Sequence, residues 1–359
     1  AGQDREVVLS RYGIYVQPET GSKPFYLDDE QCQPLAKLGQ FKFYFPYESA
    51  KLNRVEPEGV WEYIRDRKAW RAVVPGMSDY NCFIVVKKGA HAAGTYGLTG
   101  VIQLWTDKLW LEEPYIYVYA ECGDYSAWGD DPYGKFFVYD VYGTPKPKSA
   151  AGKYGIQLRG MNGVTTLTDF SKLGYCVWAG TVYSDGKKGS GAKIPGYDIS
   201  NESRYTIYVR PKSQACTMLR FRDSIWTDVP AYLNVLLFDH NPDLSVLPKY
   251  GIQICNQNGK TTYTSKYCPL MGGQLLSAMS GYSKYKTPYF NLANYGTFVS
   301  SINNKNYDLA ALGLYVSGNY YDIRFLATVD SGWMGDMWTN NGNVQGIYNT
   351  HCIDGDLYL

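Results

Sequence analysis

The chain has 359 residues and a formal net charge of +1, and only 19% of its residues are charged. A near-neutral chain without a run of Lys or Arg lacks the basic surface that attracts nucleic acid, so we expect no nucleic-acid partner. No apolar stretch approaches the ~20 residues of a membrane span, and the opening sequence AGQDR lacks the pattern of a signal peptide. We therefore expect a soluble chain with no membrane insertion.

The composition is rich in aromatic residues, with 35 Tyr, 13 Phe and 9 Trp. Tyr favours strands because its flat ring packs on a pleated surface while its hydroxyl still reaches water. The 37 Gly and 17 Pro supply residues for turns. These features predict an all-β protein, and the length indicates two or three domains.

A repeated segment is the strongest signal in the chain. The sequences KYGIQLRGMNGVTTLT, from Lys153, and KYGIQICNQNGKTTYT, from Lys249, agree at 10 of 16 positions without a gap. A weaker copy begins at Arg11, and a Gly follows each of the three starts at the same offset. Self-similarity of this kind indicates a copied structural unit.

Each copy of the repeat has the pattern of a β-hairpin. Ile156 and Leu158 alternate with polar residues, as in a half-buried strand. Asn162-Gly163 and Asn258-Gly259 are the residue types that a type I′ turn requires, since both of its central residues have positive φ. Thr-rich return strands follow, and Thr20-Gly21 replaces Asn-Gly in the first copy.

The segments before the second and third copies also correspond. Phe137-Val138-Tyr139-Asp140 precedes Pro145, and Leu236-Leu237-Phe238-Asp239 precedes Pro242. Pro removes a donor from a strand ladder, so we place domain boundaries at these connectors. The sequence thus predicts three tandem β-sandwich-like modules: residues 1–146, the most divergent, then 147–245 and 246–359.

Short strands separated by turn residues are expected throughout. In the first module they cover residues 41–47, 83–86, 101–105, 115–119 and 136–141. In the second module they cover 175–183, 205–209, 218–221 and 232–238. In the third module they cover 289–298, 310–316 and 322–329, with a short strand near Leu357. Only residues 60–73 favour a helix, because Trp61, Ile64 and Ala69 would share one of its faces.

Motifs for catalysis and for cofactors are missing from the sequence. The three histidines lie near no nucleophile signature, and no nucleotide-binding or zinc-protease motif is present. Asp239-His240-Asn241-Pro242-Asp243 holds metal-capable side chains, but these residues also favour a turn for backbone reasons. The eight cysteines show no zinc spacing, and we expect them reduced and partly buried. We therefore expect no enzyme, no metal and no cofactor.

Three aromatic segments are the candidate binding loops. Trp beside Asp or Asn can anchor a protein partner or stack on a sugar ring, and it can also fold back to close the end of its own sandwich. These three alternatives stay open on the sequence alone. The candidate residues are Trp128, Asp130, Tyr133, Trp226, Trp333 and Trp338.

The module start resembles a family of small uncharacterised proteins encoded among the tail genes of tailed bacteriophages. The resemblance is carried by Tyr154-Gly155-Ile156-Gln157-Leu158 with Gly163, and by Tyr250-Gly251-Ile252-Gln253-Ile254 with Gly259. It covers about the first 20 residues of each module, and the first copy departs from it at Tyr15 and the turn that follows. The resemblance implies a virion component of the tail, made in the host cytoplasm, with no catalytic residues to carry over.

Three functions are compatible with these observations. The first is a structural tail protein, in the tail tip, a fibre attachment or a collar, that contacts other virion proteins as a homo-oligomer or within a symmetric assembly. The second is an adhesin that binds a host surface glycan through the Trp-bearing loops. The third is a polysaccharide hydrolase, which only the scattered carboxylates favour.

Overall fold

A computed structural model of the chain describes residues 15–16, 18, 25–26, 33–44, 61–88, 91–94, 101–123, 136–146, 155–160, 163–168, 173–187, 190–245, 251–255, 258–295, 297–303, 306–333 and 349–359. These residues form antiparallel β-sheets joined by turns and three short 3-10 segments, Arg65–Arg67, Met77–Asp79 and Gly355–Leu357. The all-β, sandwich-like class is confirmed. No described helix is long and apolar enough to cross a bilayer.

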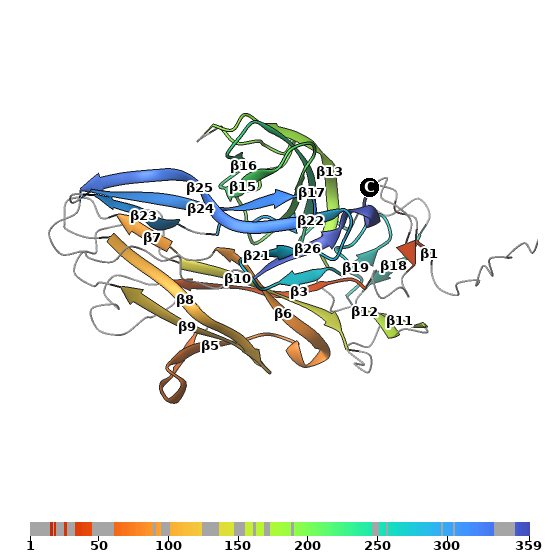
Figure 1. Cartoon of the computed structure of the whole chain (residues 1–359). Coiled ribbons are helices and arrows are strands. Elements are labelled where there is room, and N and C mark those ends of the chain that lie inside the picture. Colours follow the sequence, from red (N-terminus) through yellow and green to blue (C-terminus); the bar gives the residue numbers. More distant parts are fainter. Residues whose placement is uncertain are drawn as a thin grey trace, which may run out of the picture.

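Four large sheets stack in layers, which Figure 1 shows from the lower to the upper side of the molecule. We number them in stacking order. Sheet 1 contains β4 (Glu62–Ile64), β5 (Ala69–Val73), β9 (Tyr115–Gly123), β8 (Val101–Glu112) and β7 (His91–Gly94). Sheet 2 contains β3 (Ala36–Tyr44), β10 (Phe136–Pro145) and β6 (Tyr80–Lys88).

The other two layers come from the rest of the chain. Sheet 3 contains β13 (Tyr175–Ser184), β17 (Ala231–Asp239), β14 (Tyr205–Pro211), β22 (Pro288–Asn291), β26 (Thr350–Asp354) and β20 (Gln274–Leu276). Sheet 4 contains β16 (Ser224–Thr227), β15 (Cys216–Phe221), β24 (Asn306–Ser317), β25 (Tyr320–Trp333) and β21 (Ser280–Tyr282), with β23 (Thr297–Asn303) paired to β24.

The two inner sheets are buried on both faces. Successive side chains of a strand point to opposite sides, so each inner strand contributes to two interfaces. On β10, Phe137 and Tyr139 pack in the apolar core shared with sheet 1, whereas Asp140 and Tyr142 face sheet 3. On β17 of sheet 3, Leu237 belongs to the core shared with sheet 4. The molecule therefore consists of two β-sandwiches stacked through sheets 2 and 3.

The second and third predicted modules build one sandwich together. In sheet 3, β14 pairs with β22, and in sheet 4, β15 pairs with β24, so both sheets cross residue 245. This arrangement differs from the expectation that each module has its own core. The physical reason is that the strands on either side of the boundary are too few to bury both of their apolar faces alone, and they complete each other's sheets.

The three predicted hairpins all form as two-stranded sheets. They are β1 (Tyr15–Val16) with β2 (Phe25–Tyr26), β11 (Gly155–Gly160) with β12 (Gly163–Thr168), and β18 (Gln253–Cys255) with β19 (Thr261–Thr264). Val16 and Ile254 hold equivalent positions in the repeat, and both are buried in the same core. The copied segment therefore supplies apolar side chains to a shared core between the sandwiches.

The expected type I′ turns lie mostly outside the described residues. The second ladder extends to the pair Gly160–Gly163, and residues 161–162 lie outside the described part of the chain. In the third copy the ladder ends at the pair Cys255–Thr261, so the connection is longer than two residues, and Gly259 within it adopts φ +74°. Residues 20–21, 154 and 250 also lie outside the described residues.

The helix expected over residues 60–73 is wrong. This segment forms the hairpin of β4 and β5, with Tyr63 paired to Trp70. The chain reverses through a 3-10 turn followed by Lys68 in the left-handed region, at φ +48°. Pairing of β5 with β9 outweighs the helical pattern because it places Ala72 in the core between sheets 1 and 2.

A test of the shared sandwich is to express residues 147–245 alone. We expect this fragment to lack a cooperative unfolding transition, because β14 and β15 lose their partners β22 and β24. Urea denaturation followed by tryptophan fluorescence, with the full chain as reference, measures this. A fragment that unfolds cooperatively would restore the module as an independent domain.

Candidate functional site

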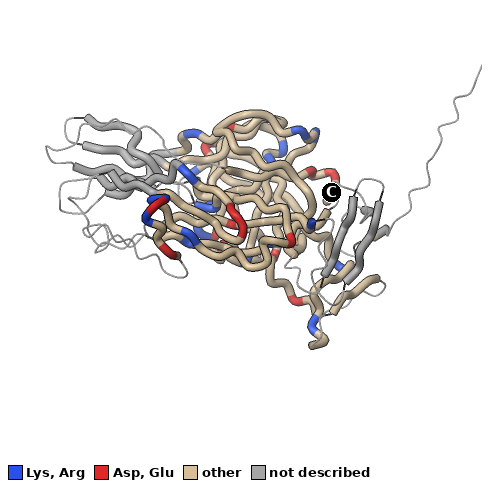
Figure 2. The backbone as a smooth tube through the Cα atoms, turned by 90° about the horizontal axis from the view of Figure 1, so that it is seen from below, with Lys and Arg blue, Asp and Glu red and all other residues tan. Residues whose placement is uncertain are grey.

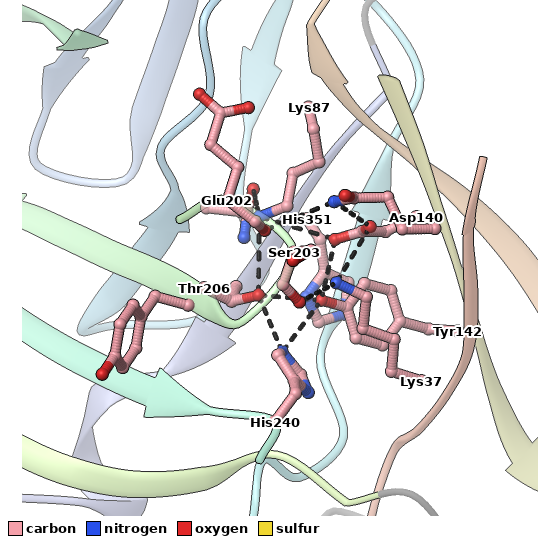
Figure 3. Close-up of polar contacts among 12 residues, drawn as sticks. Lys37, Lys87, Asp140, Tyr142, Glu202, Ser203, Thr206, His240 and His351 are labelled. Carbon is pink, nitrogen blue, oxygen red and sulfur yellow. Dashed lines mark hydrogen bonds and ion pairs between the residues drawn. The ribbon is translucent and has the colours of Figure 1, made fainter. Parts of the chain in front are cut away.

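A group of buried polar side chains fills the interface between sheets 2 and 3 (Figure 3). Asp140 lies at its centre and is 0% exposed. Lys37 Nζ lies 3.0 Å from Asp140 Oδ1, and Lys87 Nζ lies 3.8 Å from Asp140 Oδ2. Gln40 Nε2 donates a further hydrogen bond to Oδ1 at 2.9 Å. We call this group the Asp140 cluster; its members are Lys37, Gln40, Lys87, Asp140, Tyr142, Thr206, His240 and Asn291.

Two β-bulges bring the lysines to the carboxylate. Asp140 sits on β10, the middle strand of sheet 2, between β3 and β6. The pairing of β10 with β3 shifts between Val141 and Tyr142, so that Lys37 and Gln40, three residues apart, both contact Asp140. The pairing of β10 with β6 shifts between Val138 and Tyr139, which leaves Lys87 as the extra residue of β6. Bulges of this kind re-aim side chains that regular alternation would send elsewhere.

Sheet 3 supplies the remaining partners. Thr206 Oγ1 on β14 lies 3.0 Å from the Tyr142 hydroxyl and 2.8 Å from His240 Nε2. Lys37 Nζ also donates to the backbone carbonyl oxygen of Ser203 at 3.1 Å. Gly174 leaves room for the imidazole, since a Cβ there would lie 2.6 Å from His240 Cε1. The cluster is thus assembled by both sandwiches.

Burial sets the protonation of the cluster. Desolvation lowers the pKa of Lys87 from 10.5 to about 7, in spite of the nearby Asp140 carboxylate. Burial also lowers the pKa of His240 well below 6.5 and raises the pKa of Tyr142 well above 10. The imidazole is therefore neutral and the phenol protonated, and the carboxylate of Asp140 is balanced by lysine.

The described residues also line a hollow at the surface. A surface hollow of about 230 Å³ lies between residues 210–215 and 316–318, and no member of the Asp140 cluster lines it. Among the described side chains, no group of three or more His, Cys, Asp or Glu residues is arranged to hold a metal ion. Four of the described cysteines, Cys176, Cys216, Cys268 and Cys352, are buried. Figure 2 shows cationic and anionic residues interspersed over the described backbone.

Exposed aromatic pairs form a second feature, on strands at the lateral edges of the upper sandwich. Tyr183 on β13 faces Tyr232 on β17, with ring centroids 4.9 Å apart, and both rings are more than half exposed. Tyr282 on β21 faces Tyr320 on β25 at 5.1 Å, and Tyr282 is 68% exposed. Strands β13 and β21 end their sheets at opposite sides of the sandwich. Exposed large aromatics are the residue type that protein interfaces favour.

The outer face of sheet 1 carries a row of aromatic rings and charges. Trp110 stacks on Tyr117 with centroids 5.0 Å apart and an interplanar angle of 5°. Arg67 lies over the Tyr117 ring and pairs with Glu112. Arg71 lies over the Tyr115 ring, 4.3 Å from its centroid. A planar ring beside carboxylate and guanidinium groups is a surface that can bind a protein or a sugar.

The structure locates two of the six candidate loop residues. Trp226 lies in β16 and not in a loop; it is only 7% exposed and packs against Phe221 at 4.3 Å. Its ring joins Leu219, Ala311 and Leu326 in a small apolar cluster that is separate from the core between sheets 3 and 4. Trp333 is the last residue of β25, paired with Asn306. Trp128, Asp130, Tyr133 and Trp338 lie outside the described residues.

Sequence reasoning missed the Asp140 cluster, although one signal pointed toward it. The corresponding runs Phe137–Asp140 and Leu236–Asp239 both place an acidic residue after apolar ones. Asp140 pairs with Lys37, and Asp239 pairs with Arg204 at 2.8 Å, so both acids are buried and paired. An acid within an apolar strand indicates a buried ion pair. The expected turn after β17 is present, where Asp239 Oδ1 accepts from the backbone N–H of Asn241.

The fold and this interface define a layered all-β protein whose two sandwiches share a buried charged cluster. The model of DUF6453, a family of unknown function, matches residues 117–328, which is more than half of the chain, and the chain belongs to that family. No curated protein matches the sequence at a significant level. No solved structure does so either.

Removing the central carboxylate should destabilise the fold strongly. Asp140→Ala leaves Lys37 buried without a counter-charge, and breaking a buried pair typically costs about 3–5 kcal/mol of the free energy of unfolding. Urea denaturation at pH 7 measures the change. Glu112→Ala, which removes an exposed ion pair with Arg67, is the matched control and should leave the free energy nearly unchanged. Equal effects of the two substitutions would contradict the structural role of Asp140.

Acid should destabilise the protein through its buried histidines. Burial lowers the pKa of His351 from 6.5 to about 3, and that of His240 falls well below 6.5. Below pH 6.5 the unfolded chain therefore takes up protons that the folded chain does not, and the free energy of unfolding falls as the pH drops. Each histidine contributes at most about 1.4 kcal/mol per pH unit. His351→Gln should flatten the slope measured between pH 6 and pH 4, and an unchanged slope would contradict this assignment.

Proposed function

We propose that this protein is a structural component of a tailed-bacteriophage virion, associated with the tail, that acts through protein–protein contacts and not as an enzyme. The repeated module start supports this proposal through its resemblance to proteins encoded among tail genes. A rigid body made of four stacked sheets suits such a role, because each outer face and edge stays available to neighbours.

The observation that carries the proposal is the pair of exposed aromatic contacts at opposite edges of the upper sandwich. Tyr183 with Tyr232 marks the β13 edge, and Tyr282 with Tyr320 marks the β21 edge. Sheet edges also present unpaired backbone groups that can contact another chain. Two different edges that meet head to tail generate a ring when the rotation closes, which fits a homo-oligomer in a symmetric assembly.

A glycan-binding role is the second candidate, favoured by the outer face of sheet 1. There Trp110 is partly exposed above Tyr117, with Glu112 and Arg67 beside it. Aromatic rings can stack on a sugar face, and the charged groups can bond its hydroxyls. In this candidate the sugar-binding surface lies on strands β8 and β9 of sheet 1, whereas the sequence pointed to the Trp-bearing loops.

Self-association should depend on both aromatic edges. The double variant Tyr183→Ala/Tyr232→Ala, and separately Tyr282→Ala, should each weaken association about tenfold or more, because interface aromatics often contribute over about 1.4 kcal/mol. Sedimentation velocity over a concentration series measures this. Tyr63→Ala, which removes an exposed ring of sheet 1, is the control. A wild-type chain that stays monomeric, and that is missing from mass spectra of purified particles, would count against the proposal.

The glycan role has a separate test. Trp110→Ala should abolish binding to any array glycan that the wild-type chain retains, whereas Tyr183→Ala should not. A wild-type chain that binds none of the sugars on a bacterial glycan array would remove this candidate.

A further inference from the structure

Three buried side chains of the Asp140 cluster, those of Lys87, Asn291 and Asp140, lie close together and are of types that can react with one another. Lys87 Nζ lies 3.4 Å from Asn291 Oδ1 and 3.8 Å from Asp140 Oδ2. Asp140 and Asn291 are 0% exposed and Lys87 is 2% exposed. Asn291 Nδ2 is buried with no hydrogen-bond partner among the described residues. An amine, a carboxamide and a carboxylate therefore meet where water is excluded.

The backbone holds this arrangement in place. Lys87 is the extra residue of the bulge at the end of β6, and Asn291 ends β22. The backbone N–H of Asn294 donates to the carbonyl oxygen of Lys87 at 3.0 Å, and Lys88 bridges Asn294 in parallel. The end of β6 is thus tied to the segment that follows β22. This contact holds the amine beside the carboxamide, with Lys87 Nζ 3.4 Å from the oxygen of the carbonyl group that it would attack.

The charge balance favours a neutral amine at Lys87. One carboxylate can neutralise one ammonium group, and Lys37 is the closer of the two lysines, at 3.0 Å against 3.8 Å. Arg220, also buried, adds positive charge near Lys87. Burial lowers the pKa of Lys87 to about 7, so the uncharged amine is well populated at neutral pH. A desolvated, uncharged lysine is a nucleophile.

We propose that Lys87 and Asn291 react to form an intramolecular isopeptide bond, with Asp140 as the proton-transfer group. The lone pair of Lys87 Nζ attacks the Asn291 side-chain carbonyl carbon, and the N–C bond forms. Asp140 accepts a proton from Nζ and delivers it to the Asn291 nitrogen, which leaves as ammonia when its C–N bond breaks. The reaction needs no oxidant, reductant or co-reactant, and it returns Asp140 to its starting form.

The bond would connect the two sandwiches. Lys87 belongs to sheet 2 and Asn291 to sheet 3, and they are 204 positions apart in the chain. A cross-link over so long a loop removes many conformations from the unfolded chain, so it stabilises the folded state. It would also hold the two sandwiches together under pulling force.

The intact mass of the purified full-length chain, measured after denaturation, tests the proposal directly. We expect a mass lower than the sequence mass by one ammonia, and a protease digest that contains a branched peptide joining Lys87 to Asn291. A chain at the full sequence mass overturns the proposal, and so does a cross-link that uses Lys37, which contacts the same carboxylate but not Asn291.

Matched variants separate the three roles. Lys87→Arg keeps a long basic side chain but has no nucleophilic amine, and it should show the full mass of its sequence. Asp140→Asn should reduce the linked fraction at least tenfold. Asn291→Asp should link with loss of water and reach the same final mass as the linked wild type, because both end as the same amide. Lys193→Arg, at an exposed lysine, should link fully.

A Lys87→Arg chain that still forms the cross-link overturns the assignment of Lys87 as the nucleophile. If the substitutions prevent folding, the mass of the wild-type chain still decides the proposal.

Discussion

The carboxylate of Asp140, buried between two sheets, is the constraint on which the rest of the architecture depends. It lies on the middle strand of sheet 2 and accepts contacts from both neighbouring strands, while Lys37 continues to a backbone carbonyl of the second sandwich. A charge without water must be paired, so the strands that carry its partners are fixed in register with each other. The bulges in sheet 2 follow from this requirement.

The contact between the sandwiches differs from the cores within them. Within each sandwich the core is apolar and its contacts are not directional. Between the sandwiches, hydrogen bonds among Tyr142, Thr206 and His240 run beside an apolar cluster that includes Tyr208 and Phe238. Polar groups with defined partners permit few relative positions, so this interface specifies how the two sandwiches stack. The repeated hairpins strengthen it, since Val16 and Ile254 pack into the same cluster.

This organisation is consistent with a protein that transmits or resists force. One buried charged cluster lies inside, where it joins sheets 2 and 3, and exposed aromatic groups lie on edges and outer faces. A covalent bond between Lys87 and Asn291 would strengthen the same contact, because it would join sheet 2 to sheet 3, the layers through which the two sandwiches stack. The exposed aromatic groups would then contact neighbouring proteins, and the buried cross-link would keep the two sandwiches together during that contact.

The sequence by itself determined the all-β class, the positions of most strands and the three hairpins, because alternation, turn residues and repetition are local signals. It could not determine that residues 147–245 and 246–359 share both sheets, since strand partners are chosen by packing across the whole chain. The same holds for residues 60–73, where pairing with β9 outweighed a helical pattern. The Asp140 cluster also required the tertiary structure: Lys37 and Lys87 are far apart in the chain and reach one carboxylate through two bulges, and the stacking of sheets 2 and 3 brings Asn291 beside Lys87.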